Sequence, residues 1–202
     1  MAFHTPNCKL VSKSYGRLAY NDFLRSKTNP AWDGIVPAGL RELNYEDSLT
    51  NKELEKTFIG ITKKRFAARV QPCIEAPSIC GNMYTASTYC SLISLLSNID
   101  LSSAVGKRIG LFSYGSGIAS TLFTIRVVGD VQPIVKAIDL MARLEKRRVT
   151  GPEEYEAACA LREKAYGASD YTPKGDVDSL FPGTYYLEKI DEMYRRSYSI
   201  RQ

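Results

Sequence analysis

The stretch MYTASTYCSLISLL, from Met83 to Leu96, contains no charged side chain, and its apolar and small residues would occupy every face of a helix. At about 1.5 Å per residue, such a helix would run for about two dozen ångströms without a charge. Helices that are apolar all round are buried. The pattern therefore predicts a helix that other elements cover on every side.

The residues before this stretch predict two amphipathic helices. The pair Thr5-Pro6 indicates a helix start, with threonine at the cap and proline at the first position, and apolar residues then recur at three- and four-residue spacing to Arg25. Residues 28–48 hold two prolines and two glycines, and we expect a long loop there. A second helix is predicted for residues 51–69, followed by a short irregular strand over residues 71–81.

The residues after it predict a hairpin, two helices and a closing hairpin. Alternating segments at 107–114 and 120–128 flank a glycine-rich turn. Helices are expected at 133–147 and 152–166, and a second, aromatic-rich hairpin at about 184–200. Residues 1–202 are thus expected to form one α/β domain with a mixed sheet packed by helices.

Composition narrows the classes of partner. The chain has 27 lysines and arginines against 22 aspartates and glutamates, which suits an anionic ligand but lacks the clustered basic stripe of a nucleic-acid binder. No apolar run approaches the roughly 20 residues of a membrane span, and the start has no signal-like apolar region. The five cysteines show no zinc-like spacing. We expect a cytoplasmic protein with reduced thiols, no bound metal, no nucleic acid and no membrane contact.

Four motifs in order resemble one enzyme family. They are FHTPNCKLVSKS (residues 3–14), GNMYTASTY (81–89), GKRIGLFSYGSG (106–117) and DSLFPGTYYLEKIDEMYRRSY (178–198). Together they are similar to the carboxy-terminal half of hydroxymethylglutaryl-CoA synthases, a branch of the thiolase superfamily. The resemblance implies a thiolase-like layered fold that needs a second half to complete its αβαβα architecture.

The family's reaction condenses acetyl-CoA with acetoacetyl-CoA, in isoprenoid or related polyketide metabolism. A cysteine is acetylated, a glutamate removes a methyl proton, and the enolate attacks the ketone. The resemblance makes His4 the residue that orients the acetoacetyl carbonyl, and its place before a helix N-terminus would favour the neutral ring. The alternative is a capping or surface histidine. Coenzyme A thioesters enter as substrates, and no other cofactor is implied.

The resemblance also implies three binding residues outside the glycine-rich turn. Lys9 and Lys13 match lysines that contact coenzyme A, and their four-residue spacing places both on one helix face. A solvated helix face is the alternative reading of that spacing. Asn82 matches an asparagine whose amide meets the acyl carbonyl or hydroxyl, and it could equally cap the following helix.

Ser116 matches a serine near the substrate carboxylate or thioester. Its glycine neighbours would let backbone amides approach a developing oxyanion, although such a triplet is also an ordinary turn. Tyr84 and Tyr114 lie in the same motifs and are possible binding residues or packing residues.

The family's cysteine and glutamate precede the histidine motif, and this sequence begins three residues before His4. Among the chain's own cysteines, Cys80 lies nearest to Asn82 in sequence, but none is favoured over a buried small apolar residue. We therefore expect a separate amino-terminal chain to supply both groups within an oligomer, with the acceptor bound to coenzyme A or to a carrier protein. The alternatives are a non-condensing acyl-CoA-binding or scaffold module, and a homologue that uses His4 for new acid/base chemistry.

Overall fold

The computed structural model describes residues 1–115, 117 and 119–202, and Ser116 lies outside them. The chain divides into two compact units, Met1–Lys146 and Arg147–Gln202, which are described separately. The described residues that were predicted to bind substrate belong to the first unit. In the part of the chain that the structure describes, no helix has the length and apolar character of a membrane span.

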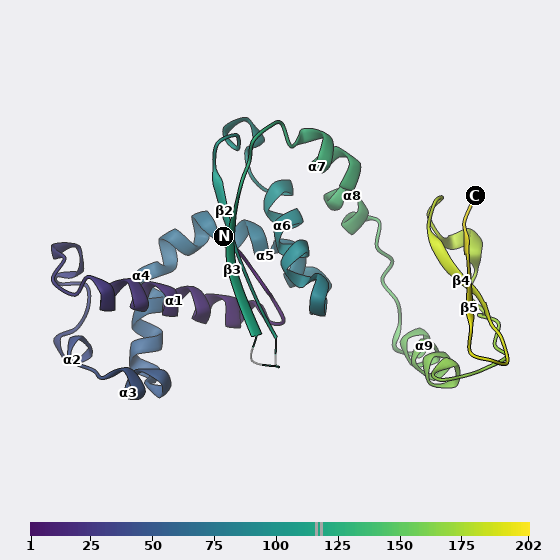
Figure 1. Cartoon of the computed structure of the whole chain (residues 1–202), viewed down its shortest axis with the longest axis horizontal. Helices are drawn as coiled ribbons and strands as arrows, with labels where there is room; N and C mark the ends of the chain where they lie inside the picture. The colour runs from purple at the N-terminus through teal and green to yellow at the C-terminus, as the bar shows by residue number, and fades with distance from the viewer. Residues whose placement is uncertain (116, 118) are drawn as a thin grey trace. The chain divides into compact units, whose positions relative to one another are not determined.

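The first unit contains a mixed three-stranded sheet of order β1-β2-β3 (Figure 1). Strand β2 (Arg108–Gly115) pairs antiparallel with β3 (Ala119–Arg126), which confirms the predicted hairpin. The short strand β1 (Ala2–Phe3) pairs parallel with β2, with Phe3 opposite Phe112. This pairing joins the amino-terminal motif to the glycine-rich one.

Helices α1 (Cys8–Arg25) and α4 (Lys52–Arg69) pack against each other beside the sheet (Figure 1). The predicted start of α1 at Thr5-Pro6 is wrong. The side chain of Asn7 caps the helix instead, since its Oδ1 accepts a hydrogen bond of 2.8 Å from the Lys9 amide. Thr5 is buried, and its hydroxyl donates a hydrogen bond to the Phe3 carbonyl, so it does not cap the helix.

Residues 28–48, predicted as a long loop, instead contain short helical turns. These are η1 (Pro30–Trp32), α2 (Ala38–Arg41) and the first residues of α3 (Tyr45–Thr50). Asparagine or proline precedes each turn, and these residues favour helix starts as well as loops. Composition alone therefore could not distinguish the two.

The strand predicted over residues 71–81 is wrong, because α5 (Gln71–Cys80) is a helix. Pro72 lies in its first turn, where a missing N–H costs nothing. Pro77 lies inside the helix, where proline removes one backbone hydrogen bond. The burial of Cys73, Ile74 and Ala76 offsets this loss of stability. Tertiary contacts with the following helix thus override a proline-rich local sequence.

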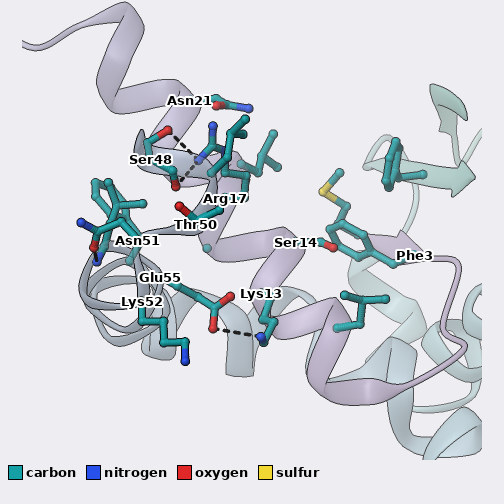
Figure 2. Close-up of a pocket in the computed structure, with 18 of the residues that line it drawn as sticks. Phe3, Lys13, Ser14, Arg17, Asn21, Ser48, Thr50, Asn51, Lys52 and Glu55 are labelled. Carbon is teal, nitrogen blue, oxygen red and sulfur yellow. Dashed lines mark hydrogen bonds and ion pairs between the residues drawn. The ribbon is translucent and has the colours of Figure 1, made fainter. Parts of the chain in front are cut away.

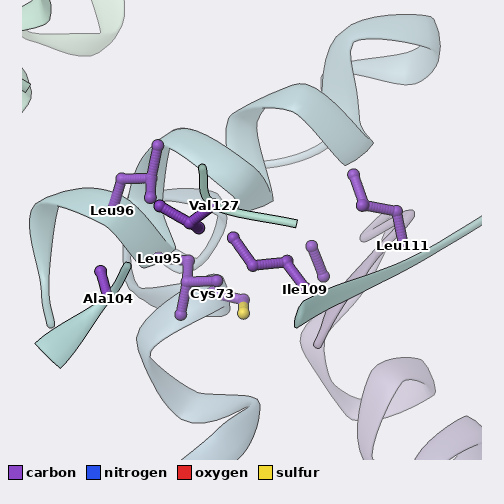
Figure 3. Close-up of a cluster of buried hydrophobic side chains, with 8 residues drawn as sticks. Cys73, Leu95, Leu96, Ala104, Ile109, Leu111 and Val127 are labelled. Carbon is purple, nitrogen blue, oxygen red and sulfur yellow. The ribbon is translucent and has the colours of Figure 1, made fainter. Parts of the chain in front are cut away.

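The uncharged stretch forms η2 (Tyr84–Ala86) and then α6 (Ser87–Ser97), with η3 (Leu101–Ser103) beyond it. One face of α6 packs into the core cluster that Figure 3 shows, where Leu95 and Leu96 lie near Cys73 and Val127. Another face of α6 is left uncovered within this chain, since Tyr89 is 65% exposed.

The remaining elements follow the predicted order. The single helix expected at 133–147 is divided into α7 (Gln132–Ile138) and α8 (Leu140–Glu145), because Asp139 adopts a left-handed conformation with φ of 47°. The second unit contains α9 (Pro152–Ala165), η4 (Val177–Ser179) and the predicted closing hairpin. Its strands are β4 (Tyr185–Ile190) and β5 (Arg196–Ile200).

Candidate functional site

His4 lies where β1 ends, beside the end of β2. Its backbone amide donates a hydrogen bond of 2.8 Å to the Phe112 carbonyl, which continues the pairing of the two strands. The imidazole meets the ring of Tyr114 edge to face, with centroids 5.0 Å apart and an interplanar angle of 85°. The Tyr114 ring in turn stacks on Phe112 at 5.7 Å. The register of β1 on β2 thus brings together residues from two distant motifs.

The hydroxyl of Tyr114 is a buried hydrogen-bond donor. Its hydroxyl oxygen is buried and makes no hydrogen bond within the described part of the chain. Burial also raises the pKa of this phenol. A buried hydroxyl without a partner is costly, and a ligand oxygen beside it would remove that cost.

Asn82 lies in the turn between α5 and η2. Its Oδ1 accepts a hydrogen bond of 2.9 Å from the backbone amide of Tyr84, the first residue of η2, and the side chain does not cap α6, which begins after Ala86. Asn82 is exposed, and Tyr84 is 75% exposed with φ of 48°. Ser87, the first residue of α6, accepts a hydrogen bond of 2.6 Å from the Thr5 amide. The turn that carries Asn82 therefore leads into the helix end that contacts the residue after His4.

The two lysines of α1 are in different environments. Lys9 is exposed in the first turn. Lys13 makes an ion pair of 3.0 Å with Glu55 of α4 (Figure 2). Lys13 also lines a cavity of about 650 Å³, in which Phe3 and Phe112 form part of the wall. His4 does not line that cavity. The sequence pattern did not reveal that a carboxylate already pairs with one of the two lysines.

Three of the five cysteines lie in environments that disfavour the thiolate. Burial raises the pKa of Cys8, Cys73 and Cys90, which lowers the thiolate fraction of each at neutral pH. Cys80 and Cys159 are exposed. Across the described ranges, no cluster of three or more histidine, cysteine, aspartate or glutamate side chains is arranged to hold a metal ion.

Comparisons with known proteins agree with the motifs. A family model described as the hydroxymethylglutaryl-coenzyme A synthase C terminal matches residues 1–201. A hydroxymethylglutaryl coenzyme A synthase of a Fusarium species is 66% identical over 201 residues, which cover 100% of this chain and 44% of that protein. The chain therefore spans less than half the length of this curated relative.

Two solved structures show the same fold. MvaS in complex with 3-hydroxy-3-methylglutaryl coenzyme A matches 100% of this chain and 41% of its own, with a TM-score of 0.69 and 27% identity. The HMG synthase of the curacin biosynthetic pathway, in complex with acetyl donor-ACP, matches 98% of this chain and 42% of its own, with a TM-score of 0.64 and 26% identity. The chain belongs to the hydroxymethylglutaryl-coenzyme A synthase family, and it corresponds to the carboxy-terminal half of the thiolase-like fold of that family.

Proposed function

We propose that this chain is the acyl-acceptor-binding half of a hydroxymethylglutaryl-CoA synthase-like enzyme. It would hold acetoacetyl-CoA, or a related β-keto thioester, for attack by an acetyl enolate. The observation that carries the proposal is the edge-to-face contact of His4 with Tyr114, beside the start of α6. This arrangement places a histidine and an unpaired phenol hydroxyl at one strand end.

The chemistry of these groups suits a carbonyl acceptor. An imidazole N–H of His4 donates to the ketone oxygen, where negative charge develops as the new carbon–carbon bond forms. The Oδ1 of Asn82 is engaged by the Tyr84 amide, which orients the Nδ2 group to donate to the acyl carbonyl or hydroxyl. Ser116 is proposed to contact the substrate carboxylate or thioester.

In this proposal the nucleophilic cysteine and the basic glutamate come from an amino-terminal half carried on a separate chain. The raised pKa values of Cys8, Cys73 and Cys90 support this division, because a nucleophile needs a stabilised thiolate. The partner would cover exposed side chains of this unit. Tyr89 on α6 and Leu122 on β3 are 65% and 59% exposed, respectively.

We propose coenzyme A as the carrier of the acceptor. The Fusarium relative is a hydroxymethylglutaryl coenzyme A synthase, and MvaS was solved with 3-hydroxy-3-methylglutaryl coenzyme A. The curacin enzyme was solved with an acetyl donor-ACP, so a carrier protein is the alternative source of thioester. Lys9, which is exposed, is the first candidate for the coenzyme A phosphates.

Reconstitution tests the proposal. The chain is mixed with the amino-terminal half of a hydroxymethylglutaryl-CoA synthase, and each half alone serves as the control. With acetyl-CoA and acetoacetyl-CoA, the mixture is expected to release free coenzyme A and form 3-hydroxy-3-methylglutaryl-CoA, detected by mass spectrometry. A parallel arm supplies acceptor bound to acyl carrier protein. A mixture that forms a stable complex but makes no product from either acceptor contradicts condensation and leaves acyl-CoA binding as the function.

Changing the charges on α1 and α4 is expected to alter coenzyme A affinity in opposite directions. Lys9→Ala should weaken binding by about tenfold, because it removes a charge-assisted hydrogen bond to phosphate. Glu55→Gln should strengthen binding by roughly two- to fivefold, because it releases Lys13 from a half-exposed ion pair. Isothermal titration of the reconstituted enzyme with coenzyme A measures both effects.

The matched control is Lys64→Ala, which removes the same charge from an exposed position on α4. It is expected to leave coenzyme A affinity unchanged. If coenzyme A affinity depended on net charge alone, Lys9→Ala and Lys64→Ala would weaken binding equally. That result would exclude specific contacts between the α1 lysines and coenzyme A.

A further inference from the structure

We infer that Ser87 and Ser91 are positioning residues for His4. Their hydroxyl groups, on the first two turns of α6, hold the backbone on both sides of His4 and so fix the direction of its imidazole. The inference deepens the proposed function and rests on it for the role of His4 toward the acceptor carbonyl. The hydrogen bonds themselves can be tested without that role.

Both peptide groups that flank His4 are held. The Phe3 carbonyl accepts hydrogen bonds of 2.9 Å from the Ser91 hydroxyl and from the Thr5 hydroxyl. The Thr5 amide donates a hydrogen bond of 2.6 Å to the Ser87 hydroxyl. The hydroxyls of Thr5 and Ser91 also lie 3.1 Å apart. Together with the bond from the His4 amide to β2, these contacts leave the backbone of His4 little freedom.

These bonds are shielded from water. Thr5 and Ser87 are 2% exposed and Ser91 is fully buried, so solvent cannot replace a lost partner. A buried amide without a partner is unfavourable, and the backbone of Thr5 would have to shift to find another one. Because the peptide before and the peptide after His4 are both held, the ring can move only by side-chain rotation. The edge contact with Tyr114 at 5.0 Å restricts that rotation too.

A third serine of the same helix provides an internal comparison. Ser94 is also fully buried, but its hydroxyl faces α5: it accepts a hydrogen bond of 3.1 Å from the Ala76 amide and donates one of 2.8 Å to the Pro72 carbonyl. Ser94 therefore matches Ser91 in residue type, helix and burial, but its hydroxyl bonds α5 instead of the His4 segment. The difference between the two serines separates positioning of His4 from general support of α6.

The single histidine of the chain makes the test direct. In the full chain labelled with isotopic histidine, one imidazole gives the only side-chain histidine signals in a carbon–proton NMR spectrum. Their shifts report the Tyr114 ring current. Ser87→Ala is expected to move or broaden these signals and, in the reconstituted enzyme, to weaken acetoacetyl-CoA binding by about tenfold. Ser94→Ala is expected to leave the histidine signals in place.

Ser91→Ala is the second variant. The Thr5 hydroxyl still donates to the Phe3 carbonyl, so this variant should fold even where Ser87→Ala does not, and it should produce a smaller shift. The inference is overturned if Ser91→Ala and Ser94→Ala change the histidine signals equally, or if folded Ser87→Ala leaves them unchanged. If the signals move as expected but the wild-type reconstitution makes no product, positioning stands and the proposed function fails.

Discussion

Replacement of His4 by alanine is expected to lower the rate of condensation by about 10²- to 10³-fold, the usual cost of removing one donor to a developing oxyanion. The imidazole lies at the end of β1 against Tyr114, with its backbone held by β2 and α6. A donor fixed there would stabilise the charge on the ketone oxygen without reorganising during the reaction. The measurement is steady-state formation of 3-hydroxy-3-methylglutaryl-CoA by the reconstituted enzyme.

Two further variants distinguish the loss of the His4 hydrogen-bond donor from a change in the shape of the site. His4→Gln retains an N–H donor and should recover part of the lost rate. Tyr114→Phe retains the ring that contacts His4 while removing the phenol, so it should cost less than His4→Ala. A folded His4→Ala enzyme with a rate within about threefold of wild type would exclude the transition-state role that is assigned to this histidine.

Phe58→Ala is expected to reduce the free energy of unfolding by about 3–5 kcal/mol, as is typical for removal of a buried phenyl ring. Phe58 is 1% exposed and joins α1 to α4, with its ring 5.2 Å from Tyr20 and 6.3 Å from Trp32. Domains are stable by only about 5–15 kcal/mol, so the loss would be a large fraction of the total. It would also loosen the helix that carries Lys9 and Lys13.

Trp32 is the only tryptophan and lies in the same cluster, so its fluorescence during urea denaturation reports this loss. The control is Phe123→Ala on β3, where the ring is 42% exposed and the expected loss is below about 1 kcal/mol. Equal shifts of the urea midpoint for the two variants would mean that the cluster between α1 and α4 does not limit stability.

The sequence pattern predicted the secondary structure correctly where interactions between neighbouring residues determine it. The hairpin of β2 and β3 follows from period-two alternation around a glycine-rich turn, and α4 follows from its amphipathic spacing after Asn51. The prediction failed at residues 71–81, where two prolines indicated an irregular strand and burial against α6 produced a helix. Packing contributes more there than intrinsic preference does, and a single sequence does not show packing.

The candidate site likewise has residues that the sequence identified and contacts that it did not. The motifs identified His4, Lys9, Asn82 and Tyr114 as separate candidates. They contained no sign that Lys13 pairs with Glu55, because that contact depends on how α1 lies against α4. They also gave no reason to select Ser87 and Ser91 from a helix rich in serine. A buried serine is expected to make a hydrogen bond, but its partner is known only from the tertiary structure.

The sequence by itself determined the family, most elements and the residue types available for chemistry, because motifs and periodicity are properties of neighbouring residues. Only the tertiary structure decided that His4 meets Tyr114 and that the hydroxyls of α6 hold the residues around it. These contacts join residues far apart along the chain, and hydrogen bonds require donor and acceptor within about 3 Å. That proximity depends on strand register and helix packing, which short sequence patterns do not specify.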